Sequence, residues 1–148
     1  MNITPENHMK RLLPILLLFV ASIGHAQSIE HAIDIRTIAC LDLDSNQTTY
    51  GMIQCESIAR EEWNTEMNKY YNLLVDTLSD ESGVLLSESQ KTWTEFNQNE
   101  QKFSSSLYYS EMQGTMWHVV NAGRRSEIVR QRALELKQYY ETYMHSGM

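Results

Sequence analysis

Histidines, cysteines and clustered carboxylates are the residues of this chain that could support catalysis or metal binding. Beyond residue 26 the histidines are His31, His118 and His145, which lie in three separate segments. They form no His-x-x-x-His or Glu-x-x-His pair from which a metal site is commonly built. The sequence also has no nucleophile elbow, phosphate-binding loop or dinucleotide-binding glycine pattern. We therefore predict that the chain is not an enzyme, with no catalytic residue, metal or cofactor.

Two groups of residues are candidates for contact with another protein. Glu61, Glu62 and Glu66 lie close together in a segment with helical periodicity. Glycosidase chemistry needs two carboxyl groups held across a cleft, whereas carboxylates on the outside of one helix usually face solvent. Tyr108 and Tyr109 fall in a segment that we expect to be an exposed loop, and exposed aromatic side chains are common interface anchors. These five residues are our sequence-based prediction of the partner-binding surface.

The first 26 residues have the pattern of an export signal. Lys10 and Arg11 precede an apolar run over residues 12–23, and small residues at Gly24 and Ala26 fit a cleavage site. The apolar run of twelve residues would span about 18 Å as a helix, against about 30 Å for a bilayer core. We predict cleavage before Gln27, with no lipid or membrane anchor, and a periplasmic or secreted location. Translation could start at Met1 or at Met9.

Cys40 and Cys55 are the two cysteines of the chain. Export would deliver them to an oxidising compartment, where a disulfide persists. Closing this short loop would stabilise the fold by about 3 kcal/mol in the loop-entropy model. Two buried free thiols or a metal-binding pair are the alternatives, although a metal would need further ligands.

The chain is acidic, with 12 Lys and Arg against 19 Asp and Glu, a net charge of −7 and a pI near 5.2. Loss of the predicted signal peptide changes the net charge to −8. This charge disfavours binding to nucleic acid phosphates. Residues 121–148 hold five of the basic residues and only three acidic ones, so we expect the last helix to carry the basic surface.

Hydrophobic periodicity and low glycine and proline content predict an all-α fold. Apolar residues recur every three or four positions over residues 48–78, and Thr48 or Thr49 can cap this helix. The positions are Met52, Cys55, Ala59, Trp63, Met67, Tyr70, Leu74 and Leu78.

Two further helices are predicted. In the second, the inner stripe is formed by Leu86, Ser89 or Gln90, Trp93, Phe96, Phe103 and Leu107. A third runs from about residue 115. Its inner side would carry Met116, Val119, Val129, Ala133, Leu136, Tyr140 and Tyr143. We therefore predict a signal peptide over residues 1–26, an irregular disulfide-tethered arm over 27–47, and a small antiparallel bundle of three main helices over 48–148.

The order and spacing of several motifs resemble the N-terminal domain of the LprI-like lysozyme inhibitors. The matching features lie between about residues 38 and 136. They are Cys40, the segment from Thr48 to Cys55, Asn68 with Tyr71, Gln90 with Trp93, and Arg132 with Glu135 and Leu136. Asn97 and Gln98 stand where family members commonly carry Arg-Asp, and the third cysteine of those members is missing.

The resemblance implies a small exported helical domain that binds and inhibits a peptidoglycan-cleaving lysozyme. Many lysozymes are strongly basic, so an acidic domain would be steered toward them. The alternative is an envelope or secreted protein-interaction module with another partner and no effect on lysozyme.

Overall fold

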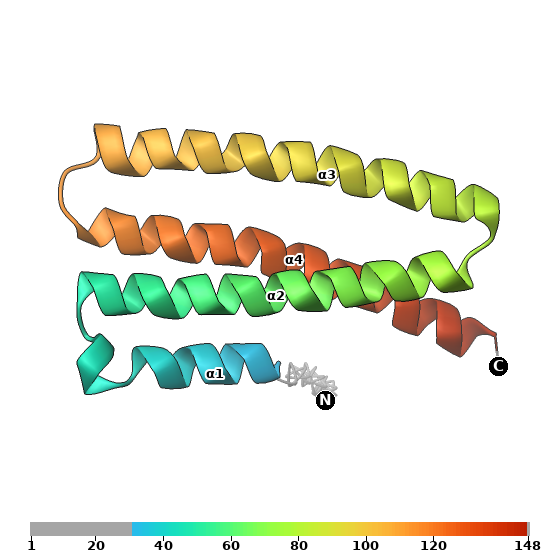
Figure 1. Ribbon diagram of the computed structural model, residues 1–148, viewed down its shortest axis with the longest axis horizontal. Helices are drawn as coiled ribbons and strands as arrows, with labels where there is room; N and C mark the ends of the chain where they lie inside the picture. Colours follow the sequence, from blue (N-terminus) through green and yellow to red (C-terminus); the bar gives the residue numbers. More distant parts are fainter. Residues whose placement is uncertain (1–30, 148) are drawn as a thin grey trace, which may run out of the picture.

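The computed structural model describes residues 31–147, which contain helices and no strand (Figure 1). The all-α prediction is therefore confirmed, but this part of the chain has four α-helices rather than three. The predicted signal peptide lies outside the described residues. The elements are α1 (Ala32–Leu41), the 3₁₀ turn η1 (Asp44–Asn46), α2 (Thr49–Thr77), α3 (Asp80–Ser106), the π-helical turn η2 (Leu107–Glu111) and α4 (Met116–Ser146).

Helix α2 is the central helix, and it begins at the predicted cap. The Thr48 side chain accepts a hydrogen bond from the Gly51 backbone N–H at 3.0 Å, which satisfies a free donor of the first turn. Six of the eight predicted inner positions of α2 are buried, and Met52 and Leu78 at its two ends are half-buried. Ser79 caps α3 in the same way, so the two helices are separated by only two residues.

Helix α1 replaces most of the predicted irregular arm, so that prediction is wrong for residues 32–41 and 44–46. His31 caps α1 through its ring nitrogen Nδ1, which accepts a hydrogen bond from the Ile33 backbone N–H. Ile33 is the one buried residue of α1, whereas Ile35 and Ile38 are about half exposed. The short helix therefore depends on its contacts with α2 and α4.

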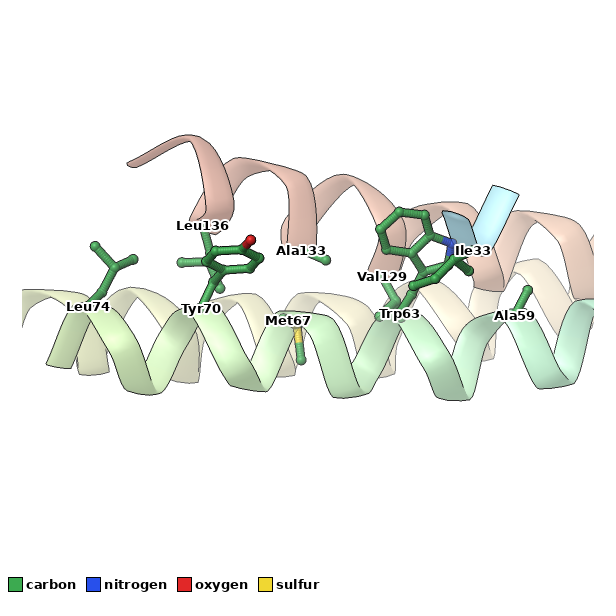
Figure 2. Close-up of a cluster of buried hydrophobic side chains, with 9 residues drawn as sticks. All are labelled: Ile33, Ala59, Trp63, Met67, Tyr70, Leu74, Val129, Ala133 and Leu136. Carbon is green, nitrogen blue, oxygen red and sulfur yellow. The ribbon is translucent and has the colours of Figure 1, made fainter. Parts of the chain in front are cut away.

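The core lies mainly between α2 and α4 (Figure 2). Trp63 is 1% exposed and fills the space between α2 and α4, next to Ile33 of α1. Val129, Ala133 and Leu136 supply the α4 side, as predicted. Met116 and Tyr143, also predicted to face inward, are exposed because they lie near the two ends of α4, outside this core.

Helix α3 is attached to the bundle by hydrogen bonds and an ion pair to α4 and by a few apolar side chains. Its predicted apolar stripe is only partly correct: Leu86 and Trp93 pack against the core, but Phe96 and Phe103 are 51% and 61% exposed. Ser104 is the one buried residue of α3. Polar residues of α3 hydrogen-bond the arginines of α4, while Phe96 lines a pocket beside Arg124 and Arg132 and stays half exposed.

The disulfide between Cys40 and Cys55 joins the end of α1 to α2, which confirms the predicted pairing. The two Cα atoms are 5.8 Å apart. Asn46 of η1 lies against both sulfur atoms and donates a hydrogen bond from Nδ2 to the Cys40 carbonyl at 2.9 Å. The disulfide and this turn together hold α1 against α2.

None of the helices in residues 31–147 combines the length and apolar character that a bilayer crossing requires.

Candidate functional site

The structure separates the three predicted acidic residues into different environments. Glu62 pairs with Arg36 of α1 at 2.8 Å. Glu66 pairs with Lys69 at 3.2 Å and lies 3.6 Å from the His31 ring. Glu61 is exposed and forms no ion pair with residues 31–147. Two of the three carboxylates therefore make contacts within the fold, and Glu61 remains accessible to a partner.

The predicted tyrosine pair lies in the π-helical turn η2 rather than in a loop. Tyr108 is half-buried and stacks on Trp117, with ring centroids 5.9 Å apart. Tyr109 is 47% exposed and meets the His118 ring edge-on at 4.6 Å. We call Tyr108, Tyr109, Trp117 and His118 the aromatic end. Trp117 and His118 come from α4, and their contact with the tyrosines could not be predicted because ring contact across a turn has no fixed sequence spacing.

The arginines of α4 do not form the predicted basic surface. Arg124 pairs with Glu100 of α3 at 3.0 Å, and Arg130 pairs with Asp34 of α1 at 2.9 Å. Arg125 donates hydrogen bonds to the Ser105 hydroxyl and the Gln101 carbonyl of α3. These side chains attach α1 and α3 to α4, and the charges of Arg124 and Arg130 are balanced by carboxylates of the same chain.

Arg132 is the most deeply placed of these arginines, with 7% exposure. It donates hydrogen bonds to Gln90 at 3.0 Å, to Ser89 at 3.2 Å and to Glu135 at 2.6 Å. Gln90, Arg132 and Glu135 are all part of the sequence pattern that resembles the LprI-like domain. Their position between α3 and α4 gives that part of the pattern a structural role.

Many carboxylates remain exposed and outside the ion pairs found within residues 31–147. They are Asp42, Asp44, Glu61, Asp76, Asp80, Glu81, Glu88, Glu95 and Glu111. Because three of the four α4 arginines, Arg124, Arg130 and Arg132, form ion pairs within the fold, the accessible charge of this part of the chain is predominantly negative. Such a surface favours a basic partner.

A groove of about 830 Å³ runs between α1 and α4, with α2 as its floor. Ala59 and Trp63 form part of the floor. Arg130 lies in the groove, where its guanidinium is 5.5 Å from the Trp63 ring centroid and makes two hydrogen bonds to Asp34. One wall of this groove is α1, a segment predicted to be irregular, so the groove could not be predicted from the sequence.

Glu56 lies in the same groove and is half-buried. A Cβ atom at Gly123 would stand 3.6 Å from its Oε1 atom, so the glycine faces the carboxylate. Burial raises the pKa of Glu56 above its usual value, and the charge of Glu127 acts in the same direction. A hydrogen bond with Ser126 acts in the opposite direction. Glu56 forms no ion pair within the described part of the chain.

Residues 31–147 contain no cluster of three or more His, Cys, Asp or Glu side chains arranged to hold a metal ion. The geometry offers surfaces for contact, namely the groove, the aromatic end and the exposed carboxylates.

Comparison with known proteins connects this geometry to a family. The family model described as lysozyme inhibitor LprI matches residues 40–136. The chain belongs to the LprI lysozyme inhibitor family. The matched segment begins at the first cysteine of the disulfide and ends at Leu136 in the core of α4. It therefore covers α2, α3 and most of α4, whereas nearly all of α1 lies before it.

A solved structure shows the same fold. A crystal structure of an uncharacterized protein from Burkholderia thailandensis superposes with a TM-score of 0.74 at 31% sequence identity. The match covers 80% of this chain and 58% of that chain, so the present chain spans little more than half of the solved one. No curated protein matches the chain.

Proposed function

We propose that this chain is an exported protein that binds a peptidoglycan-cleaving lysozyme and inhibits it by covering the substrate cleft. Membership of the LprI lysozyme inhibitor family over residues 40–136 is the observation that carries the proposal. The Cys40–Cys55 disulfide supports an oxidising location, either the periplasm or the exterior. The resemblance found in the sequence led to the same expectation.

The surface charge supports a basic partner. Exposed carboxylates are distributed over α2, α3 and the turns, while three of the four arginines of α4 form ion pairs within the fold. An acidic surface accelerates association with a strongly basic lysozyme. This acceleration decreases as added salt screens the charges. Inhibition by contact alone requires no catalytic residue, cofactor or metal from this chain.

Cell-wall lysis assays test this proposal. Residues 27–148, purified with the disulfide formed, are titrated into lysozymes of the c, g and i types. We expect a dose-dependent loss of lysis for at least one type, and an association rate that falls markedly as salt is raised. If none of these lysozyme types is inhibited at micromolar excess of the chain, the proposal is overturned and an interaction module with another partner is favoured.

The predicted contact residues can be tested in the same assay. Glu61 and Tyr109 are the accessible members of the set, so Glu61→Ala and Tyr109→Ala are expected to weaken inhibition most. Glu62→Ala, Glu66→Ala and Tyr108→Ala remove internal contacts as well, so their thermal unfolding is measured in parallel. Unchanged inhibition in all five variants would remove these residues from the interface.

A further inference from the structure

Glu56 is placed differently from every other carboxylate in the α1–α4 groove. The two others that line the groove, Asp34 and Glu127, both pair with Arg130. Glu56 has no such cation within residues 31–147 although it is half-buried. Removing a carboxylate from water without a counter-charge is unfavourable, so this position would gain from a cation supplied by another molecule.

The surroundings of Glu56 leave room for a long side chain. Gly123 faces the carboxylate, Ala59 and Ser126 line the same groove, and none of the three has a large side chain to fill it. Ile38 and Leu41 of α1 form an apolar wall, and Ile38 is 48% exposed. Lysine and arginine have this combination of an apolar stem and a charged head.

Arg130 shows how a cation is held in this groove. Its guanidinium lies over Trp63 and makes two hydrogen bonds to Asp34, at 2.9 and 3.0 Å. A guanidinium or ammonium group beside Glu56 would form the same kind of charge-assisted contact, but it would belong to a partner protein rather than to α4. The negative surface of the chain would favour the approach of such a group.

We propose that the part of the groove formed by Glu56, Gly123, Ser126, Ile38 and Leu41 receives a lysine or arginine side chain of the bound lysozyme. We call it the Glu56 pocket. This inference rests on the proposed function, because the occupant is a residue of the lysozyme. It adds a specific contact that the general acidity of the surface does not provide.

Binding of the mature chain to a lysozyme that it inhibits tests the Glu56 pocket. Glu56→Gln keeps the size of the side chain and removes its charge. The matched control is Glu95→Gln on the exposed side of α3, which changes the net charge equally. We expect Glu56→Gln to raise Kd at least about tenfold, mainly through faster dissociation. We expect Glu95→Gln to change Kd only slightly, mainly through a slower association rate.

A second variant fills the pocket without changing charge. Gly123→Leu would place a side chain beside Glu56, since a Cβ there meets the carboxylate at ordinary contact distance. We expect it to raise Kd at least about tenfold with the thermal unfolding transition retained.

The outcomes separate the two proposals. If the wild-type chain binds lysozyme and both variants bind it equally well, the Glu56 pocket is wrong and the proposed function stands. If the wild-type chain binds no lysozyme of any type, the proposed function is wrong and the assignment of this occupant falls with it. A Kd raised equally by Glu56→Gln and Glu95→Gln would show that net charge alone matters, and would also overturn the pocket.

Discussion

Gly51 in the first turn of α2 lies directly against the backbone of Asn46 in η1. A Cβ atom at residue 51 would stand 2.6 Å from the Asn46 Cα atom and 2.7 Å from its carbonyl oxygen. Only glycine permits this approach, because the neighbouring atoms belong to the backbone. The contact lets the Asn46 side chain reach the Cys40 carbonyl and both sulfur atoms, so turn, disulfide and helix start form one unit.

Gly51→Ala is therefore expected to destabilise the protein. Overpacking of this kind costs about 1–3 kcal/mol, measured as a loss in the free energy of unfolding by chemical denaturation. Gly83→Ala is the control, because nothing lies within 4 Å of a Cβ at that helical position. That change should stabilise α3 by about 0.5–1 kcal/mol. Equal effects of the two substitutions would contradict the close contact at Gly51.

Loss of the disulfide should lower stability without removing the helices. Reduction, or Cys55→Ala combined with Cys40→Ala, is expected to cost about 3 kcal/mol, since the unfolded chain regains the freedom of a short loop. The α2–α4 core does not depend on this bond, so the far-ultraviolet circular dichroism at low temperature should retain most of its helical signal. Mass spectrometry that finds two free thiols in the exported protein would contradict the prediction.

Arg132 and Arg124 should differ strongly in their contribution to stability. Arg132→Ala removes three hydrogen bonds from a buried guanidinium that connects α4 to α3, and a loss of about 1.5–3 kcal/mol is expected. Arg124→Ala removes a more exposed ion pair with Glu100, which should contribute less than about 1 kcal/mol. Denaturant unfolding of both variants gives the comparison. A larger loss for Arg124→Ala would show that the polar attachment of α3 is wrongly described.

Glu56 should make stability depend on pH in the direction opposite to a paired carboxylate. Burial raises the pKa of Glu56 in the folded state, so between the unfolded and folded values the folded protein binds more protons at this site. The contribution of Glu56 to stability therefore falls as pH rises through the folded pKa. The stability of Glu56→Gln relative to wild type should accordingly increase from about pH 4 to about pH 7.

Wild type and Glu56→Gln share all other carboxylates, so the contributions of those groups cancel in the difference between the two free energies of unfolding. Glu95→Gln, which changes an exposed carboxylate, should show no such trend with pH. A stability difference for Glu56→Gln that stays constant across the range would mean that burial does not raise the pKa of this residue.

Helix α2 could be predicted almost completely from the sequence. Its apolar residues repeat over the full length of the helix, and a threonine cap precedes it. A long periodic pattern is a property of neighbouring residues, so it requires no knowledge of the rest of the chain.

Helix α1 could not be predicted in this way because its pattern is mixed. Ile35 and Ile38 are about half exposed while Ile33 is buried, so apolar residues occur on more than one face. The helix is held by ion pairs to α2 and α4, from Arg36 to Glu62 and from Asp34 to Arg130. These partners lie 26 and 96 positions away in the sequence, beyond the reach of local periodicity.

The sequence by itself determined the helical class, the inner face of α2 and the likeness to the LprI family, and it predicted the disulfide. Each of these follows from local spacing or from the presence of only two cysteines. Only the tertiary structure decided which surfaces are available. Contacts between distant helices pair Arg124, Arg130 and Arg132 of α4 with carboxylates and leave Phe96 and Phe103 at least half exposed. They also place Glu56 in the α1–α4 groove with no ion pair to residues 31–147. The rotation and pairing of the helices determine which charged side chains are accessible. Both depend on contacts between residues far apart in the chain, which local sequence patterns do not reveal.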